Sequence, residues 1–115
     1  MSFNDLETAR IKRAMEAFLN KRRPRPEIRH QLDVIYRITG QSVEIFEVRP
    51  AWDDPGVTLE HRVAKTTYVR TVREWRIFWM RSDLKWHRYD LAPTVKTIDE
   101  FAAIVDRDEA CCFFG

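Results

Sequence analysis

The part of the chain that most constrains the fold is the aromatic stretch from Trp75 to Tyr89, which reads WRIFWMRSDLKWHRY. It contains three of the four Trp residues of the chain. Aromatic and β-branched side chains favour a pleated, half-buried surface, and the polar pair Ser82–Asp83 favours a turn. The stretch therefore predicts a β-hairpin at the middle of a small antiparallel sheet, with the other elements packed against it.

The loop of this hairpin decides which residues face each other. A two-residue loop (Ser82–Asp83) and a four-residue loop (81–84) predict the same register, with Trp79 opposite Trp86. Side chains alternate between the two faces of a strand. One face is apolar enough for the core and carries Trp75, Ile77, Trp79 and Trp86. The other, which we call the predicted mixed face, carries Arg76, Phe78, Met80, Lys85, His87 and Tyr89.

The N-terminal half predicts one helix followed by strands. Asn4 or Asp5 can cap a helix that ends near Asn20, before Pro24. Alternating apolar residues then predict strands over residues 32–38, 43–49 and 59–71. A turn at Arg73–Glu74 joins the last of these to the aromatic hairpin and places Tyr68 opposite Trp79.

The C-terminal part predicts a linker, a second helix and an apolar tail. Residues 91–96 form the linker around Pro93, and Thr97 and Glu100 fit a capping box that begins a short helix ending near Asp106. The tail, residues 111–115, is apolar, and we expect it to pack on the sheet or on a partner. The order α-β-β-β-β-β-α predicts an α+β fold, with an antiparallel sheet of about five strands in meander order and helices on one side.

Length and composition restrict the class of protein. With 115 residues, the chain is long enough for a single domain, residues 1–115, with its own core. No apolar run approaches the roughly 20 residues that cross a bilayer, and the N-terminus is too polar for a secretory signal, so we expect no membrane association. The neighbouring Cys111 and Cys112 cannot staple distant parts of the fold, which predicts a reducing compartment such as the cytoplasm.

Several short stretches together resemble a known family. They are Lys21–Pro24, Gly40–Pro50, Trp52–Pro55, Ala64–Lys65, Trp79–Arg81, Leu84–Tyr89 and Phe113–Gly115. Distributed over nearly the whole chain, they resemble the small bacterial family labelled domain of unknown function 3024. The resemblance implies a bacterial origin and a free-standing small protein, and it implies no activity and no catalytic residue.

The first candidate site is the predicted mixed face. Lys85, His87 and Tyr89, with Arg76 on the neighbouring strand, would project together, above an apolar floor that includes Phe78. A cation, an imidazole and a phenol in one place suit anion binding or general acid–base work near neutral pH. The favoured alternative is a solvated sheet face with long side chains lying along it.

The second candidate site is the loop around Trp52 and Asp53. Trp52 would be a lid or a stacking platform, and Asp53 a base or a metal ligand. The favoured alternative is that Trp52 plugs one end of the core while Asp53 and Asp54 begin a turn.

Two further patterns carry weaker hypotheses. The basic run from Lys21 to Arg29 suits phosphate contacts, although a solvated helix end is the favoured interpretation. Carboxylates at Asp33, Glu44 and Glu47 near Arg49 suit a metal-dependent nuclease only loosely, and a cross-strand ion pair is favoured. The spacing of the three His residues predicts no metal site, and the absence of a Gly-rich phosphate loop predicts no cofactor.

The leading functional hypothesis is a non-catalytic interaction module, because the strand 75–80 is apolar on both faces and both must be covered. A homodimer partner, another protein or a ligand would cover the second face. One alternative is a small ribonuclease of the toxin–antitoxin kind, acting through Arg81, Lys85, His87 and Tyr89. Another is a small-molecule binder with a pocket between the Trp52 loop and the predicted mixed face. Nucleic acid is a less favoured partner, because the net charge is only +2.

Overall fold

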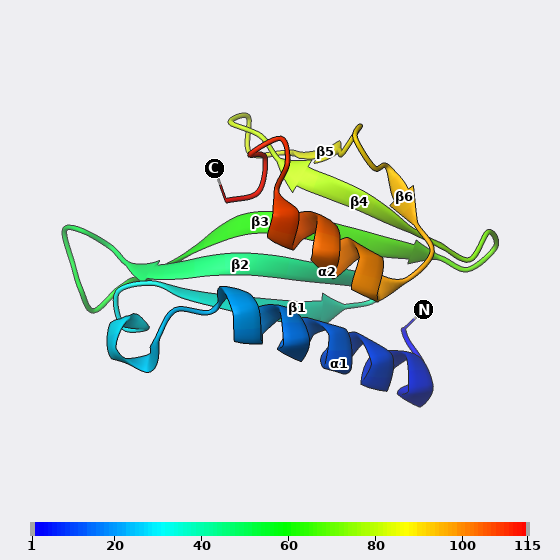
Figure 1. Cartoon of the computed structure of the whole chain (residues 1–115). Helices are drawn as coiled ribbons and strands as arrows, with labels where there is room; N and C mark the ends of the chain where they lie inside the picture. The colour runs from blue at the N-terminus through cyan, green and yellow to red at the C-terminus, as the bar shows by residue number, and fades with distance from the viewer. Residues whose placement is uncertain (1, 115) are drawn as a thin grey trace.

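The computed structural model describes residues 2–114 as a sheet with two helices laid across it (Figure 1). The described elements follow one another in the order α1 (Asp5–Arg22), the 3-10 helix η1 (Pro26–Ile28), β1 (Asp33–Thr39), β2 (Ser42–Pro50), β3 (Thr58–Val69), β4 (Glu74–Met80), β5 (Trp86–Arg88), β6 (Thr94–Val95) and α2 (Ile98–Arg107). None of these helices is long and apolar enough to cross a membrane.

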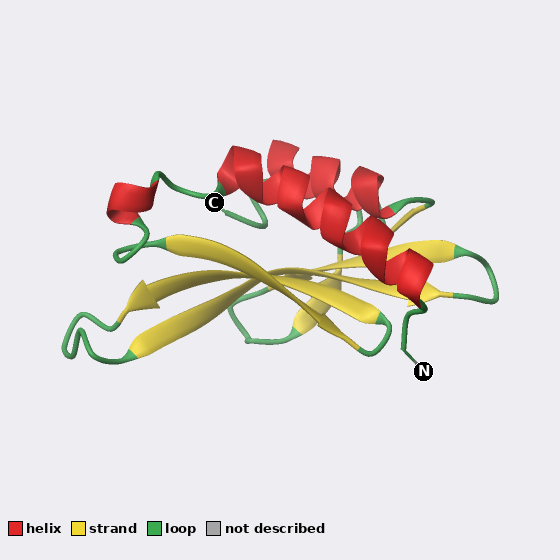
Figure 2. Ribbon diagram, turned by 90° about the horizontal axis from the view of Figure 1, so that it is seen from below, coloured by secondary structure: helices red, strands yellow, loops and turns green. Residues whose placement is uncertain are grey.

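The strands form one antiparallel sheet in the order β1-β2-β3-β4-β5, and β6 pairs with β4. Figure 2 shows both helices on the same side of this sheet. The predicted α+β meander is therefore confirmed. The two-residue strand β6 was predicted as part of the linker around Pro93, because a strand of two residues is too short to show periodicity.

The core lies between the helices and one face of the sheet. Apolar residues three and four apart on α1 bury the face that meets the sheet, and α2 contributes a second apolar face. The largest fully buried side chains from the helices are Ile11, Met15, Phe101 and Val105, and those from the sheet are Val43, Ile45, Thr66 and Ile77. The helix caps are also as predicted: Asn4 accepts a hydrogen bond from the backbone of Glu7, and Thr97 accepts one from Glu100.

The register predicted for the aromatic hairpin is wrong by one residue. The paired residues are Met80 with Trp86, Trp79 with His87 and Phe78 with Arg88. The loop contains three residues, because Leu84 adopts a left-handed conformation with φ of 62° after the turn at Ser82–Asp83. A loop with an odd number of residues shifts the pairing by one position. Glycine usually marks this conformation, so Leu84 gave no signal in the sequence.

The shift moves the side chains of β5 to the opposite faces. Trp86 points away from the helices, whereas His87 and Tyr89 lie on the helix side with Trp79. Tyr89 is buried, and its ring centroid is 4.8 Å from that of Phe113. The turn between β3 and β4 also differs from the prediction, because four residues (70–73) connect the strands and place Tyr68 opposite Trp75 instead of Trp79.

The C-terminal tail packs on the protein itself, as far as it is described. The Asp108 carboxylate accepts hydrogen bonds from the backbone N–H groups of Phe113 and Phe114. The Phe114 ring stacks on Phe18 of α1, with the Arg22 guanidinium 4.3 Å from its centroid. Gly115, the last residue of the predicted tail, lies outside the described residues.

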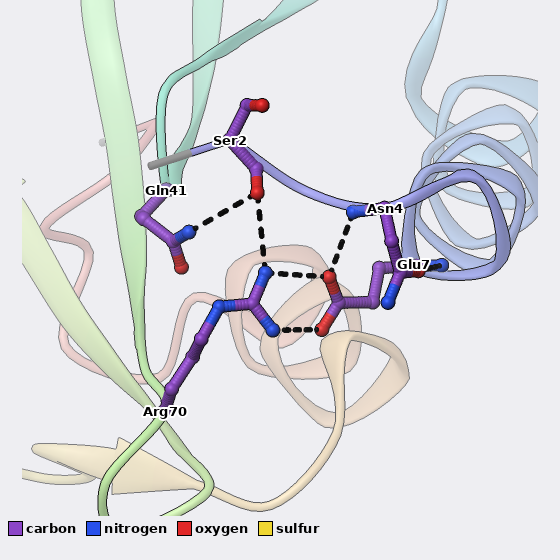
Figure 3. Close-up of polar contacts among 5 residues, drawn as sticks. All are labelled: Ser2, Asn4, Glu7, Gln41 and Arg70. Carbon is purple, nitrogen blue, oxygen red and sulfur yellow. Dashed lines mark hydrogen bonds and ion pairs between the residues drawn. The ribbon is translucent and has the colours of Figure 1, made fainter.

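A polar cluster fixes the start of α1 to the end of the sheet (Figure 3). Arg70, in the turn after β3, donates two hydrogen bonds of 2.7 Å to the carboxylate of Glu7. The backbone carbonyl of Ser2 accepts hydrogen bonds from Arg70 and from Gln41, which lies in the turn between β1 and β2. The hydrogen bond from Arg70 is the main reason that the pKa of Glu7 lies below its usual value of 4.5, and the backbone N–H of Asn4 lowers it further.

Replacing Leu84 with glycine should stabilise the protein by about 1 kcal/mol, because glycine adopts the left-handed conformation without a steric penalty. The side chain is exposed, so its loss removes little packing. Urea unfolding of Leu84→Gly against the wild type measures the change. The control is Lys85→Gly. Lys85 is the next residue and does not have a left-handed conformation, so this variant should be less stable than the wild type. A loss of stability in Leu84→Gly would contradict the three-residue loop.

Replacing Arg70 with glutamine should lower stability at pH 7, and the difference from the wild type should shrink as the pH falls. Because the folded-state pKa of Glu7 is lowered, its ion pair stabilises the protein above about pH 4.5 and is lost as the pH falls through that lower pKa. Urea midpoints measured between pH 7 and pH 3 test this. Lys12→Gln on the exposed side of α1 is the control, and a difference independent of pH in Arg70→Gln would refute the assignment.

Candidate functional site

The face of the sheet that points away from the helices, here called the open face, carries a row of side chains across five strands. Residues directly opposite each other in an antiparallel pair share a face. The pairings therefore align, from β1 to β5, Arg37, Glu44, Lys65, Phe78 and Arg88. Neighbouring rows on this face contribute Phe46 and Arg62, Arg76, and the pair of Met80 and Trp86.

Cations and an aromatic ring alternate over part of the open face, from Lys65 through Phe78 to Arg88, whereas the carboxylate of Glu44 lies on the other side of Lys65. Lys65 lies directly opposite Phe78, and its ammonium nitrogen is 5.9 Å from the centroid of the Trp86 ring. Near the other edge of the sheet, the Arg37 guanidinium is 5.0 Å from the centroid of Phe46. Both distances are in the range of cation–π attraction. Phe78 and Trp86 are half-buried although no helix lies over this face.

Several of these cations keep their charge unpaired. Arg62, Lys65 and Arg76 form no ion pair within residues 2–114, whereas Arg37 pairs with Glu60 and Arg88 with an aspartate beside it. Unpaired cations next to the half-buried rings of Phe78 and Trp86 suit a ligand that offers both negative charge and flat groups.

The predicted mixed face does not assemble as expected. Arg76 and Phe78 lie on the open face, but Lys85 is exposed in the hairpin loop and His87 lies on the helix side. Tyr89 is buried, and burial raises the pKa of its hydroxyl. A buried phenol with a raised pKa is a poor base at neutral pH.

His87 instead forms a pair with Asp83 in the hairpin loop. Its Nε2 atom is 2.8 Å from one carboxylate oxygen of Asp83, and the other oxygen accepts a hydrogen bond from the Lys85 backbone. These contacts, with the one to His87 the larger, lower the pKa of Asp83. The pair lies across the sheet from Lys65 and Arg76, so these cations cannot hold a phosphate beside it. Its structural role is to clamp the loop.

The predicted plug at Trp52 is wrong. Trp52 lies in the loop between β2 and β3, and its relative exposure is 95%. The loop is closed by hydrogen bonds from Ala51 N–H to Val57 C=O and from Val57 N–H to Asp54 C=O. Figure 1 shows it at the left-hand end of the sheet, beyond the helices. The neighbouring Asp53 is also exposed, and within residues 2–114 no cluster of His, Cys, Asp or Glu side chains is arranged to hold a metal.

Some residues of the two weaker candidates, the basic run and the carboxylates, form ordinary ion pairs. Arg23, in the basic run, donates two hydrogen bonds to Asp33 at 2.7 and 2.8 Å. Glu47 pairs with Arg49. Asp33 is opposite Val48, so it lies on the face of the sheet opposite that of Glu47. The carboxylates proposed for a nuclease therefore do not converge.

Fold and site together define a two-layer α+β domain with one sheet face covered by helices and the other free of them. The family model described as Domain of unknown function (DUF3024) matches residues 3–115. The chain belongs to this family, as the resemblance predicted. No curated protein and no solved structure matches the chain.

Replacing Trp52 with alanine should change the free energy of unfolding by no more than about 0.5 kcal/mol, as for other exposed positions. Trp75→Ala is the matched control, because that indole is 7% exposed and its loss should cost about 3 kcal/mol or more. Urea unfolding compares the two variants. Equal losses of stability in Trp52→Ala and Trp75→Ala would contradict the exposed position of Trp52 and indicate that it is part of the core.

Proposed function

We propose that this protein is a non-catalytic binding module that holds single-stranded nucleic acid on its open face. The observation that carries the proposal is the position of Lys65, which lies opposite Phe78 and has its ammonium nitrogen 5.9 Å from the centroid of the Trp86 ring, on a face without helices. The alternation of cations and rings that is missing from the basic run 21–29 is present there.

The chemistry of a single strand matches this alternation. Its unpaired bases stack on aromatic side chains, and its phosphates attract the unpaired Arg62, Lys65 and Arg76. Stacking does not depend strongly on the base, so binding should have little sequence preference. A duplex buries its bases and offers only its backbone, which predicts weaker binding to this face.

A protein partner is the second candidate. It is supported by the apolar side chains of Phe78 and Met80 on the same strand whose other face carries the buried Ile77. A strand that is apolar on both sides gains stability when both are covered, and a second copy of the chain would provide such a cover.

The ribonuclease alternative is less favoured, because Tyr89 is buried and His87 is paired with Asp83. Arg76, the predicted cation on the neighbouring strand, lies on the other face of the sheet from His87. The pocket expected between the Trp52 loop and the predicted mixed face is also less favoured, because the residues of that predicted face are divided between the two faces of the sheet. We also propose a reducing compartment, the bacterial cytoplasm, and the two free thiols of Cys111 and Cys112 support this proposal.

Fluorescence anisotropy with labelled single-stranded oligonucleotides at low salt tests the proposal. Trp86→Ala and Lys65→Glu should each weaken binding roughly tenfold or more, from lost stacking and reversed charge. Lys12→Glu, on the exposed side of α1, makes the same change in net charge and should leave the affinity nearly unchanged. Affinity should fall as salt rises.

Two results would end the nucleic-acid proposal. One is a wild-type protein that binds no single strand at low salt. The other is an equal loss of affinity in Lys12→Glu and Lys65→Glu, which would indicate attraction to net charge alone. Light scattering tests the second candidate, a dimer through the open face, by measuring the molar mass of the wild type and of Phe78→Glu. Such a dimer should dissociate in that variant.

A further inference from the structure

A cleft of about 380 Å³ lies on the helix side, away from the open face. It opens between α1, the first turn of α2 and the adjoining ends of β3 and β4. Figure 1 shows these segments together at the right-hand end of the sheet. The volume is in the range of sites for small organic ligands.

The floor of the cleft is apolar and partly aromatic. Ile11, Trp75 and Ile98 line it, and each is at least nine-tenths buried. Tyr68 forms one wall, with its ring centroid 5.0 Å from that of Trp75. A flat apolar group placed there would contact ring and aliphatic carbons on several sides.

Two guanidinium groups stand at the rim without ion-pair partners among residues 2–114. These are Arg10 and Arg13 of α1. Arg10 contributes slightly to the lowered pKa of Glu7, but the carboxylate of Glu7 is held by Arg70. The remaining cation of the cleft, Lys96, is paired with Glu74.

Two carboxylates line the cleft, those of Glu7 and Asp99, and Glu7 is paired with Arg70. Asp99, in the first turn of α2, lines it together with a second groove of about 230 Å³ between the two helices. It therefore stands at the border between the two spaces. Because Arg70 pairs with Glu7 and Glu74 pairs with Lys96, the charges left without ion-pair partners among residues 2–114 are two guanidiniums and the carboxylate of Asp99. The net unpaired charge of the cleft is therefore positive.

We infer that this cleft is a binding site for a small organic anion with a flat apolar body, such as an aromatic carboxylate or sulfonate. The Phe3 ring already stacks on the indole of Trp75, with the ring centroids 5.6 Å apart. The flat body therefore contacts Tyr68 and only the part of Trp75 that lines the cleft, and the anionic group meets Arg10 and Arg13 at the rim. Guanidinium groups suit this task because they bind carboxylates through paired hydrogen bonds. The site is independent of the open face, since the sheet separates the two.

Naphthalene-1-sulfonate is a suitable probe, titrated into the full-length protein and followed by the NMR signal of the Trp75 indole N–H. The signal should shift with saturation in the wild type. The double variant Arg10→Gln/Arg13→Gln should bind the probe about tenfold or more weakly, through loss of charge-assisted hydrogen bonds. The control Lys12→Gln/Lys21→Gln removes the same charge from the same helix and should bind as the wild type does.

The uncharged analogue 1-naphthalenemethanol tests the inference on the wild type, whatever the folding of the variants. It should bind at least tenfold more weakly than the sulfonate. Equal binding of the two probes, equal loss in both double variants, or shifts at Trp52 or Trp86 in place of Trp75 would each overturn the inference. None of these results would bear on nucleic-acid binding at the open face.

Discussion

The loop of three residues between β4 and β5 is the constraint on which the two faces of the sheet depend. Asp83 clamps it by accepting hydrogen bonds from the Lys85 backbone and from His87, and Leu84 closes it in a left-handed conformation. Because side chains alternate along a strand, a single residue more or less in this loop would exchange the faces of all β5 side chains. Trp86 belongs to the open face for this reason alone.

The two faces have different physical characters. On the helix side, ring contacts such as that of Tyr89 with Phe113 cover the apolar surface, and the described part of the C-terminal tail completes the cover. On the open face, Phe78 and Trp86 are covered only in part, by long cationic side chains such as Lys65. The helix side therefore stabilises the fold, whereas the apolar side chains of the open face stay partly exposed.

The sequence predicts local structure well and the register poorly. Helix caps at Asn4 and Thr97 and the apolar spacing of α1 depend on neighbouring residues, so they are readable from the chain. The register depends on the backbone conformation of Leu84, which its residue type does not indicate. Trp52 was misplaced because its size favours burial, whereas the length of the β2–β3 hairpin carries it beyond the core. The proximity of Lys65 to Trp86 follows from the pairing of β3, β4 and β5, which no single stretch of the sequence reveals.

The most direct test of this account is a measurement of cross-strand nuclear Overhauser effects in the β4–β5 hairpin. Directly opposite side chains have Cβ atoms about 5 Å apart, which is close enough to give strong signals. The account predicts contacts between the Trp79 indole and the His87 imidazole, and between Met80 and Trp86. Contacts between the indoles of Trp79 and Trp86 would contradict it, because they would return His87 to the open face and Trp86 to the core.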